Sequence, residues 1–449
     1  MHAILNYDRG SILIRGDVKV PYSNWDPRIG AFRAMALHYA DIVGFLNRSE
    51  IDFEDHVLQP PPCPDWRCSV KLRDYQQEAL SAWQRAGRRG VIVLPTGAGK
   101  TIIALKAISE VKAPAIVIVP TLDLVEQWSK RLAEEFNTEV GVFGGGENLL
   151  APLTVSTYDS AYLRVEELGN RFPLIIFDEV HHLPAPGYGQ IAEMFASPYR
   201  MGLTATYERA DGYHSELPRL VGGKVYELQP EVLAGKHLSH YTLQKVLVNL
   251  TPKEQVEYDD LYGVFTDYLQ NNNIVLRGPR DFQHFIMRTG SDMAARRALL
   301  ARNRALEIAL SSSAKIEALK GLLSEHPCER ILIFTQHNSL VYRISRELLI
   351  PPITHQTPKE ERSEILRDFK RGSYRIVVTS KVLDEGIDVP DATMAIIISG
   401  TGSTREFIQR LGRILRKKEG KRARLVEIVS RQTSETRISQ RRMRGRAEG

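Results

Sequence analysis

The sequence of 449 residues contains only three cysteines, Cys63, Cys68 and Cys328. So few thiols at such uneven spacing exclude a disulfide framework and are typical of a reducing compartment. Only His56 stands near the first two, which disfavours a zinc site. No apolar run approaches the roughly 18 residues of a membrane span, and the N-terminus meets a charge too early for a secretory signal. We therefore expect a soluble protein of the cytoplasm.

Most of the chain has no net charge. Residues 421–449 carry nine Lys or Arg and three acidic residues, a surplus equal to the whole formal charge of +6, so residues 1–420 are neutral. Such a basic tail is commonly a solvated, partly disordered end, but it can also bind phosphate groups without a fold of its own. The sequence leaves both interpretations open.

The N-terminal part predicts a small α+β domain. The whole chain is too long for one hydrophobic core, which favours about two to four domains. Within residues 1–65, apolar positions at helical spacing over 31–46 predict a helix. Short β-like runs cover 4–7, 11–14 and 18–20. A proline cluster over 60–64 suits neither a helix nor a central strand, so we interpret it as a linker.

Two further segments predict parallel α/β sheets. Short apolar runs alternate with helical patterns, which is typical of buried parallel strands joined by helices. The first set of runs covers 91–94, 115–119, 153–156, 174–177 and 201–204, and the second covers 331–334, 375–378, 395–398 and 425–429. We expect one domain over 66–225 and a second that starts at 226–250, continues over 306–430 and ends before a basic tail at 431–449.

Residues 251–305 interrupt the second domain and predict an inserted helical hairpin. Aromatic and leucine residues recur at helical spacing from Tyr258 to Leu269, and no strand-like run interrupts them. Seven arginines and two acidic residues follow between 271 and 305. This basic part is either a solvated helix face or a nucleic-acid contact, for which Arg296 and Arg297 are the candidates.

A glycine-rich loop follows the apolar run 91–94. It reads Pro95-Thr96-Gly97-Ala98-Gly99-Lys100-Thr101 and precedes an apolar helix. Its glycines let several backbone N–H groups point at one phosphate, while Lys100 can neutralise the β- and γ-phosphates and the Thr101 hydroxyl can bind Mg²⁺. The pattern predicts an ATP site whose phosphate-binding residues are Thr96, Gly97, Ala98, Gly99, Lys100 and Thr101.

Two acidic residues end the apolar run 174–177. If this strand neighbours the strand before the glycine-rich loop, Asp178 at its carboxyl edge can hold the Mg²⁺. Glu179 can then deprotonate the water that attacks the γ-phosphate. We expect Asp178 to be a metal ligand and Glu179 to be the general base.

Arginines near the C-terminus are candidates for transition-state stabilisation. Arg413 and Arg416 stand three residues apart and therefore share one face of a helix. Phosphoryl transfer benefits from cations on the equatorial oxygens of the γ-phosphate. Because Arg413 comes 235 residues after Asp178 and from the second predicted sheet, we expect the nucleotide to lie between two domains.

The ordered set of motifs resembles a superfamily 2 helicase motor of the DEAH/DEVH kind, over roughly residues 70–430. Residues 72–76 resemble the adenine-reading element, with Arg73 and Gln76 as nucleotide-binding residues. The segments at 119–122, 155–158 and 203–206 resemble two strand-contacting motifs and the motif that couples hydrolysis to movement. The resemblance implies nucleic-acid contacts at Thr121, Thr157 and Thr379, coupling roles for Thr204, Thr206 and Gln409, and nucleotide contacts at Gly386 and Asp388.

Within that superfamily the chain is most similar to the XPB family of DNA-repair and transcription translocases. The segments 178–185, 383–391 and 406–416 carry this likeness. It implies two tandem RecA-like domains, a thumb-like insertion at 251–305, a damage-recognition-like domain at 1–65 and 3′→5′ movement on DNA. It also implies partners, namely a companion endonuclease or transcription and repair factors, whose interfaces the sequence does not reveal.

One departure from that family affects the expected activity. The family has Arg-Glu-Asp after the coupling motif, tied to DNA opening, whereas this chain has Arg209-Ala210-Asp211. Losing that carboxylate leaves ATP hydrolysis untouched but puts strand separation in doubt. We expect Arg209 and Asp211 to act on DNA.

Three functions fit these residues to different degrees. The first is an ATP- and Mg²⁺-dependent motor on duplex, forked or single-stranded DNA. The second is the motor subunit of a restriction system, which shares the motifs but works with nuclease or methyltransferase modules that are not found here. The third is a DNA-binding scaffold for which nucleotide is only a switch, and the presence of all the hydrolytic residues disfavours it.

Overall fold

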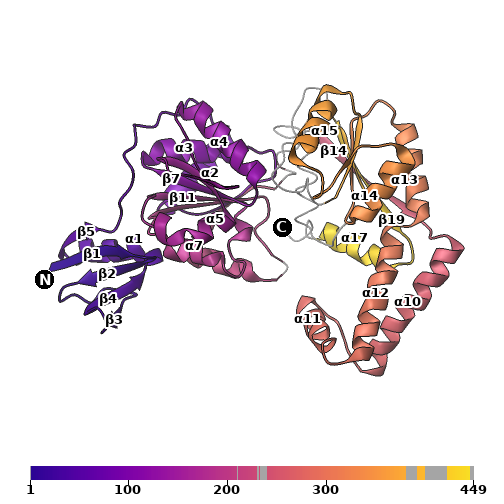
Figure 1. The fold of residues 1–449 in the computed structure, drawn as a ribbon, viewed down its shortest axis with the longest axis horizontal. Helices are drawn as coiled ribbons and strands as arrows, with labels where there is room; N and C mark the ends of the chain where they lie inside the picture. The colour runs from indigo at the N-terminus through magenta and orange to yellow at the C-terminus, as the bar shows by residue number, and fades with distance from the viewer. Residues whose placement is uncertain are drawn as a thin grey trace. The chain divides into compact units, whose positions relative to one another are not determined.

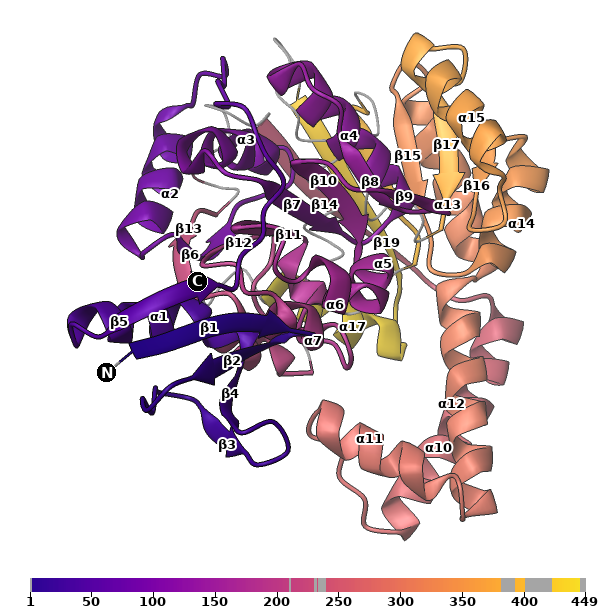
Figure 2. The same cartoon turned by 60° about the vertical axis from the view of Figure 1, so that its left-hand side comes forward.

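A computed structural model describes residues 2–209, 211–229, 232, 240–380, 392–399 and 422–444 (Figure 1). The chain divides into two compact units, residues 1–232 and 233–449. The first unit contains a small N-terminal domain and an α/β domain, and the second contains another α/β domain with a helical insertion (Figure 2). In the described part of the chain, every helix is too short or too polar to cross a bilayer.

The N-terminal domain is a five-stranded sheet covered by one helix. The sheet order is β3-β4-β2-β1-β5, and all neighbours are antiparallel except the parallel pair β1 and β5. Ile42 and Leu46 of the helix pack on the apolar face of the sheet, to which Leu5 belongs. The elements are β1 (His2–Asp8), β2 (Ser11–Arg15), β3 (Asn24–Asp26), β4 (Ala31–Met35), the short 3₁₀ helix η1 (Ala36–His38), α1 (Tyr39–Arg48) and β5 (Asp52–His56).

Two sequence predictions in this domain are wrong. The helix predicted over 31–46 begins only at Tyr39, because residues 31–35 pair with both β2 and β3 as strand β4. The run 18–20 is not a strand, although Val18 and Val20 are buried in the domain core. Over 31–35 the apolar spacing suited a helix or a strand, and pairing with β2 and β3 decided the outcome. Residues 18–20 pair with no described strand, and their apolar side chains serve only the core.

The N-terminal domain is fastened directly to the first α/β domain. The Tyr7 hydroxyl donates a hydrogen bond of 3.0 Å to the carbonyl oxygen of Met194. The Asn170 side-chain amide donates to the Val57 carbonyl oxygen at 3.1 Å, and the backbone carbonyl oxygen of Asn170 accepts from the Gln59 N–H at 2.9 Å. A side chain at Gly169 would place its Cβ only 2.0 Å from the Tyr7 hydroxyl. These contacts hold the two domains together independently of the proline linker.

The first α/β domain has an eight-stranded sheet of order β13-β6-β12-β11-β7-β10-β8-β9, parallel except for the final β8–β9 pair. Helices α3 and α4 lie on one side of the sheet and α5 and α7 on the other (Figure 1). Strands are β6 (Arg89–Val93), β7 (Ala115–Val119), β8 (Gly141–Gly144), β9 (Glu147–Leu149), β10 (Leu153–Thr157), β11 (Leu174–Asp178), β12 (Tyr199–Thr204) and β13 (Lys224–Glu227). Helices are α2 (Asp74–Arg85), α3 (Lys100–Val111), α4 (Leu122–Phe136), α5 (Tyr158–Leu163), α6 (Val165–Leu168), η2 (Val180–His182), α7 (Gly189–Met194), η3 (Tyr213–Glu216) and α8 (Leu217–Leu220).

Two expectations about this sheet need correction. Strand β12 lies between β6 and β11, so the strand that ends in Asp178 is not the direct neighbour of the strand before the glycine-rich loop. Residues 226 and 227, where we expected the second domain to start, belong to β13 and pair with β6 of the first sheet. The first domain therefore runs beyond residue 225.

The second α/β domain has a six-stranded sheet of order β14-β19-β18-β15-β17-β16 with every pair parallel. Its edge strand β14 was not recognised in the sequence, although it pairs with β19 along its whole length. The strands are β14 (His240–Val248), β15 (Ile331–Phe334), β16 (Pro352–Ile353), β17 (Ile376–Thr379), β18 (Met394–Ile397) and β19 (Arg422–Ser430). The helices are α13 (Ser313–Glu325), α14 (Asn338–Leu348), α15 (Lys359–Arg371) and α17 (Ser434–Arg444).

The insertion consists of three helices, α10 (Pro252–Asn271), α11 (Pro279–Arg288) and α12 (Met293–Leu310). Helices α10 and α12 lie side by side as the predicted hairpin, and α11 adds a third element (Figures 1 and 2). Helix α10 begins at a capping box in which Thr251 and Glu254 satisfy each other's backbone N–H groups. Phe265 of α10, Phe285 of α11 and two alanines of α12, Ala295 and Ala298, form a small core that joins the three helices.

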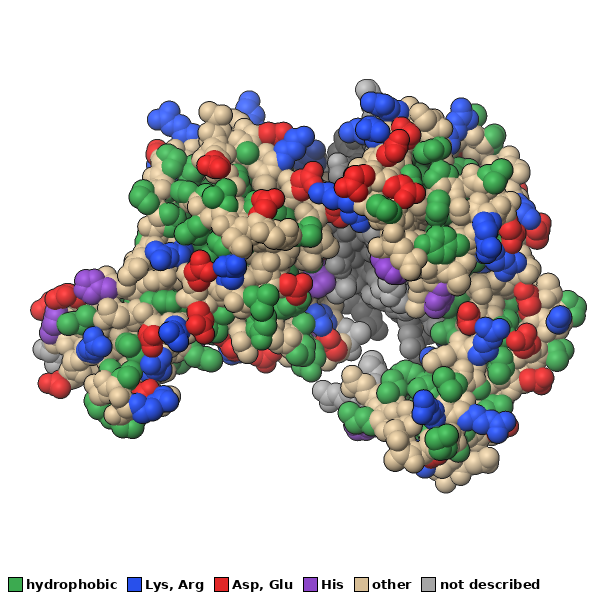
Figure 3. Space-filling model, in the orientation of Figure 1, with side chains coloured by type: hydrophobic (Ala, Val, Ile, Leu, Met, Phe, Trp, Pro, Cys, Tyr) green, Lys and Arg blue, Asp and Glu red, His purple; other side chains and the backbone are tan. Residues whose placement is uncertain are grey.

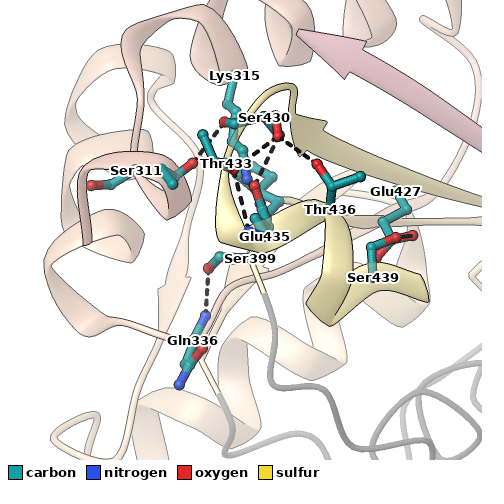
Figure 4. A network of polar contacts seen from close by, with 12 residues as sticks. Ser311, Lys315, Gln336, Ser399, Glu427, Ser430, Thr433, Glu435, Thr436 and Ser439 are labelled. Carbon is teal, nitrogen blue, oxygen red and sulfur yellow. Dashed lines mark hydrogen bonds and ion pairs between the residues drawn. The ribbon is translucent and has the colours of Figure 1, made fainter. Parts of the chain in front are cut away.

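The first part of the basic tail is folded onto the second domain (Figure 4). Glu435 of α17 is 1% exposed, and its carboxylate lies 2.6 Å from the ammonium group of Lys315 at the start of α13. Lys315 also donates at 2.7 Å to the carbonyl oxygen of Ile398, directly after β18. The second carboxylate oxygen of Glu435 accepts from the Ser430 N–H at the end of β19. One buried ion pair therefore joins two helices to the carboxyl ends of two strands.

Candidate functional site

The glycine loop, residues 95–101, curls directly after β6. Gly97 and Gly99 have φ angles of 85° and 81°, in the left-handed region that favours glycine. A Cβ at Gly99 would lie 2.5 Å from the side-chain amide of Gln76, so a larger residue does not fit there. The Lys100 ammonium group folds back over the loop and donates to the Leu94 carbonyl oxygen at 3.2 Å. Helix α3 starts at Lys100, so its first N–H groups face the concave side of the loop.

The start of α2 anchors this loop. The Tyr75 hydroxyl and the Gln76 amide both donate to the Ala98 carbonyl oxygen, at 2.8 and 2.9 Å. The Gln76 side-chain oxygen accepts from the Arg73 N–H at 2.9 Å and caps the helix. Gln76 is 3% exposed. The element 72–76 therefore has an observed role in fixing the glycine loop, and recognition of the adenine base by Arg73 and Gln76 stays a prediction.

Asp178 and Glu179 stand at the carboxyl end of β11. The Asp178 carboxylate accepts hydrogen bonds from the indole N–H of Trp128 at 2.8 Å and from the Glu179 N–H at 3.0 Å. The Tyr158 hydroxyl donates to the Asp178 carbonyl oxygen at 3.1 Å. Glu179 has a φ of 47°, which is uncommon for a residue with a side chain and common at functional sites. The Asp178 carboxylate is therefore held in place by α4 and by the backbone of the next residue.

A buried histidine connects Glu179 to residues 204–206. The Nδ1 atom of His181 lies 3.4 Å from a Glu179 carboxylate oxygen and 3.0 Å from the Thr204 hydroxyl. The Thr204 hydroxyl in turn donates to the Thr206 carbonyl oxygen at 2.8 Å and accepts from the Thr206 N–H at 3.1 Å. His181 is fully buried. A change at Glu179 can thus reach the segment after β12 through one imidazole ring.

The same histidine touches the arginine that follows this segment. Arg209 donates to the His181 carbonyl oxygen and forms a bidentate pair with Asp211, at 2.9 and 2.6 Å. These hydrogen bonds from Arg209 lower the pKa of Asp211 to about 2, so the pair stays charged at any ordinary pH. Ala210, the residue that departs from the XPB pattern, lies outside the described residues.

The residues predicted to contact nucleic acid occupy different settings. The hydroxyls of Thr121 and Thr157 cap α4 and α5, where they accept from the N–H groups of Leu124 and Ser160. Thr379 is fully buried at the end of β17 in the second domain. Arg296 and Arg297 are exposed on α12. The structure therefore leaves the two arginines accessible and ties the two capping threonines to the starts of their helices.

Several predicted site residues lie outside the described part of the chain. They are Gly386, Asp388, Gln409, Arg413 and Arg416. The strands on either side of residues 400–421 are described: β18 and β19 are parallel neighbours in the second sheet. The segment with both arginines therefore connects two adjacent strands of that sheet.

The oxygen atoms of two predicted metal ligands suit a hard cation. Thr101 offers a hydroxyl and Asp178 a carboxylate, the oxygen ligands that Mg²⁺ accepts together with water and substrate phosphates. The described residues contain no group of three His, Cys, Asp or Glu side chains that would hold a metal alone. The oxygen donors of Thr101 and Asp178 fit a Mg²⁺ ion that arrives with a nucleoside triphosphate.

Sequence reasoning missed three residues of this site: Trp128, Tyr158 and His181. Trp128 reaches Asp178 from α4, and Tyr158 reaches the same residue from α5. Neither stands in a pattern that points to an acidic residue elsewhere in the chain. His181 ends the Asp-Glu-Val-His sequence at 178–181 on which the family resemblance rests, so the motif contained the signal although no role was assigned to this residue.

The two tandem parallel sheets, the glycine loop after β6 and the acidic pair after β11 define a motor ATPase with two RecA-like domains. The helicase domain of Pyrococcus furiosus Hef has the same fold, with a TM-score of 0.53 and 20% identity over 82% of this chain and 97% of that one. Three families match parts of the chain: "Type III restriction enzyme, res subunit" at residues 69–209, "Helicase conserved C-terminal domain" at 314–418, and "Xeroderma pigmentosum group B helicase damage recognition domain" at 5–57.

Two relatives with known names identify the particular family. The chain is 48% identical to the "DNA 3'-5' translocase XPB2" of Sulfurisphaera tokodaii over 98% of its own length and 99% of that protein. It is 31% identical to the "DNA 3'-5' helicase XPB" of Mycobacterium tuberculosis over 84% of this chain and 64% of that one. The chain belongs to the XPB family, and it is a DNA helicase or translocase of the ATP-using superfamily 2.

Proposed function

We propose that this protein is an ATP-driven, Mg²⁺-dependent translocase that moves 3′→5′ on DNA. It remodels duplexes during excision repair or transcription. The observation that carries the proposal is the chain of contacts from Glu179 through His181 to Thr204 and Arg209. It supplies what a motor needs, a direct physical link between the hydrolytic carboxylate and a segment that can act on DNA. The family relationship supports the same conclusion.

Within this proposal the first domain holds the triphosphate. The N–H groups of residues 96–101 bind the phosphates, and Lys100 exchanges its contact with the Leu94 carbonyl oxygen for the β- and γ-phosphates. Thr101 and Asp178 would hold Mg²⁺, which neutralises charge on the phosphate oxygens. Glu179 takes the proton from the attacking water. Arg73 and Gln76 read the base while the contacts of Tyr75 keep the loop in place.

The second domain completes the site. Arg413 and Arg416 supply positive charge to the γ-phosphate in the transition state, and Gly386 and Asp388 contact the nucleotide. Gln409 relays the state of the nucleotide to Arg413 and Arg416. These roles rest on motif order and on the family, since the residues lie outside the described part of the chain. Release of the cleaved γ-phosphate would remove the charge that draws Arg413 and Arg416 to the nucleotide.

DNA contacts would come from both units. We assign contacts with the DNA backbone to Thr121 and Thr157 and sequence-independent phosphate contacts to the exposed Arg296 and Arg297. Thr379 is fully buried, so its proposed contact with DNA rests on the family alone. Arg209 and Asp211 would transmit each cycle to the duplex. Because position 210 is alanine, we propose translocation on duplex DNA as the main output and strand separation as the weaker one. A companion endonuclease or repair factor would work with the motor where the chromosome lies, the cytoplasm of an archaeal-type cell.

One experiment tests this function. ATP turnover is measured without DNA and with single-stranded, duplex and forked DNA, alongside displacement of a third strand from a triplex and of one strand from a fork. We expect duplex DNA to stimulate turnover, and we expect triplex displacement to exceed fork opening. Lys100→Ala should abolish turnover while salt-sensitive DNA binding persists, and Lys130→Ala, an exposed lysine on α4, should change neither. ATP turnover that DNA does not stimulate, or that persists in Lys100→Ala, would contradict the proposal.

The proposed coupling of ATP hydrolysis to movement on DNA gives a separate prediction. Thr204→Ala removes the hydroxyl that connects His181 to Thr206 and leaves the glycine loop and Asp178 in place. We expect ATP turnover within a few-fold of the parent protein and a large loss of triplex displacement per ATP consumed. The matched control is Thr154→Ala, another buried threonine of the same sheet whose hydroxyl bonds only to the nearby Ala151. Equal losses of turnover and displacement in Thr204→Ala would contradict a coupling role.

A further inference from the structure

Two aromatic side chains hold Asp178 from opposite faces of the first sheet. The indole N–H of Trp128 in α4 donates to one carboxylate oxygen of Asp178 at 2.8 Å, and the Tyr158 hydroxyl in α5 donates to its backbone carbonyl oxygen at 3.1 Å. Helices α4 and α5 cover opposite faces of that sheet (Figure 1). Trp128 and Tyr158 are each 2% exposed, so water does not compete for these hydrogen bonds. The predicted metal ligand is therefore held between two helices.

The same two helices begin at residues that we assigned to the DNA backbone. Thr121 caps α4 and Thr157 caps α5. The strands before them, β7 and β10, are parallel neighbours with Val119 opposite Thr157, and β11 pairs with the other side of β7. The carboxyl ends of β11, β7 and β10 therefore lie side by side at one end of the sheet.

One glycine brings the starts of the two helices close together. A Cβ at Gly144, the last residue of β8, would lie 3.2 Å from a methyl carbon of Leu122 and 3.2 Å from the methyl carbon of Thr157. Leu122 is the first residue of α4. Because Gly144 has no side chain, both starts border the same small gap. One strand of DNA can therefore lie against both of them.

The exposed side of α4 does not attract phosphate groups. Its exposed charged residues are Glu126, Lys130 and Glu134, and Figure 3 shows acidic and basic side chains interspersed over the first domain. A face with more acidic than basic residues offers a DNA backbone no net attraction. This leaves the first turn of α4 as its contact with DNA, and Trp128 lies about two turns along the helix from Thr121.

We propose that Trp128 and Tyr158 are positioning residues through which DNA controls the metal ligand. DNA bound at the starts of α4 and α5 fixes both helices, and the two hydrogen bonds then fix Asp178 for the Mg²⁺ that it would hold. The site therefore has a higher affinity for Mg²⁺·ATP when DNA is present, and by linkage the affinity for DNA rises by the same factor when Mg²⁺·ATP is present. The proposal rests on the protein being a DNA motor, and the route is separate from the contact of His181 with Glu179.

The chain offers matched variants for a test. Trp128→Phe removes the indole N–H and keeps an aromatic ring. Trp83→Phe makes the same change at a fully buried indole that donates to the Arg200 carbonyl oxygen at 2.9 Å. Tyr158→Phe removes one hydroxyl alone. Its control is Tyr226→Phe, which removes a hydroxyl that donates to α2 from the edge strand β13.

The measured quantity is the affinity for a fluorescent, non-hydrolysable ATP analogue in EDTA, in Mg²⁺, and in Mg²⁺ with saturating duplex DNA. In Trp128→Phe we expect the gain in affinity from Mg²⁺ to fall roughly ten-fold, the usual cost of losing an outer partner of a metal ligand. The further gain from DNA should disappear. Tyr158→Phe should reduce both gains by less, because its hydroxyl holds the backbone and not the carboxylate. Trp83→Phe and Tyr226→Phe should keep both gains of the parent protein.

An isostere separates loss of the donor from a change of shape. The amino acid β-(3-benzothienyl)alanine has nearly the shape of tryptophan but carries sulfur in place of the indole N–H. Incorporated in place of Trp128, it should reproduce the losses of Trp128→Phe. Affinity in EDTA, which depends on the glycine loop, should stay close to that of the parent protein. A residue that only packed would give the parent result with this isostere.

Three results would overturn the proposal. The first is a gain from DNA that is equal in Trp128→Phe and Trp83→Phe, and the second is an isostere protein that keeps both gains. The third is a parent protein whose ATP turnover responds to duplex DNA while its affinity for the analogue does not. Each of these removes the route through Trp128 and leaves the motor assignment intact. If duplex DNA does not stimulate turnover of the parent protein, the motor assignment fails on its own measurement.

Discussion

Glu179→Gln is expected to slow DNA-stimulated ATP hydrolysis by roughly 10²–10⁴-fold, the contribution of one well-placed general base. The amide keeps the size of the side chain but cannot accept the proton of the attacking water. Nucleotide binding should persist, because Lys100 and the N–H groups of the glycine loop are unchanged. The measurement is phosphate release at saturating DNA, paired with titration of a fluorescent ATP analogue in the absence of turnover.

The control for this substitution is Glu139→Gln, which makes the same chemical change at an exposed position of the same domain. It should turn over ATP at the parent rate. A Glu179→Gln protein that hydrolyses ATP within a few-fold of that rate would exclude Glu179 as the base. A protein that fails to bind the analogue would instead show that Glu179, with its contact to His181, is needed for nucleotide binding.

The glycine loop and the acidic pair could be predicted because each is built from consecutive residues. Gly97 and Gly99 adopt the left-handed backbone that the loop requires, and both stand within six residues of the strand that precedes the loop. Asp178 ends a run of buried apolar residues, and the end of a strand is visible in sequence. Local chemistry and local backbone preference agreed at these positions, so no tertiary information was needed.

What could not be predicted depends on which segments meet. Trp128 contacts Asp178 across 50 positions of the chain, and that contact exists only because α4 packs over this end of the sheet. The position of β12 between β6 and β11 depends on the order in which the strands join the sheet, and apolar runs in the sequence do not determine that order. Residues 31–35 have spacing that suits a helix or a strand, and pairing with β2 and β3 decided the outcome.

The tail shows how a charge count can mislead. Residues 421–449 are strongly basic, yet the first turn of α17 places the acidic Glu435 in the core of the second domain. Ser430, Thr433 and Ser439 surround the helix with buried hydroxyl contacts (Figure 4). The Ser434 N–H donates to the Tyr258 hydroxyl at 2.8 Å, so α17 also touches the helical insertion. The few acidic residues of this basic segment are therefore the informative ones, because Glu435 determines where α17 packs on the second domain.

Lys315→Met should destabilise the second unit by about 3–5 kcal/mol, the usual cost of leaving one member of a buried ion pair without its partner. The ammonium group of Lys315 and the carboxylate of Glu435 are 2.6 Å apart, and neither side chain is more than 1% exposed. Amide exchange of peptides from residues 313–325 and 422–444 measures the loss directly. Because Lys315 also holds the Ile398 carbonyl oxygen next to the segment that carries Arg413 and Arg416, ATP turnover should fall together with exchange protection.

Helix α13 contains its own control for this prediction. Lys320 and Glu317 form an ion pair of almost the same length, 2.7 Å, but both side chains are exposed, so Lys320→Met should leave exchange protection unchanged. The double variant Lys315→Met with Glu435→Leu removes both buried charges and should recover most of the lost stability, since a matched apolar pair has no desolvation cost. If Lys315→Met and Lys320→Met behaved alike, or if the double variant were less stable than Lys315→Met alone, the buried pair would not be what fixes α17. In that case the hydroxyl contacts of Ser430 and Thr433 would have to position the helix by themselves.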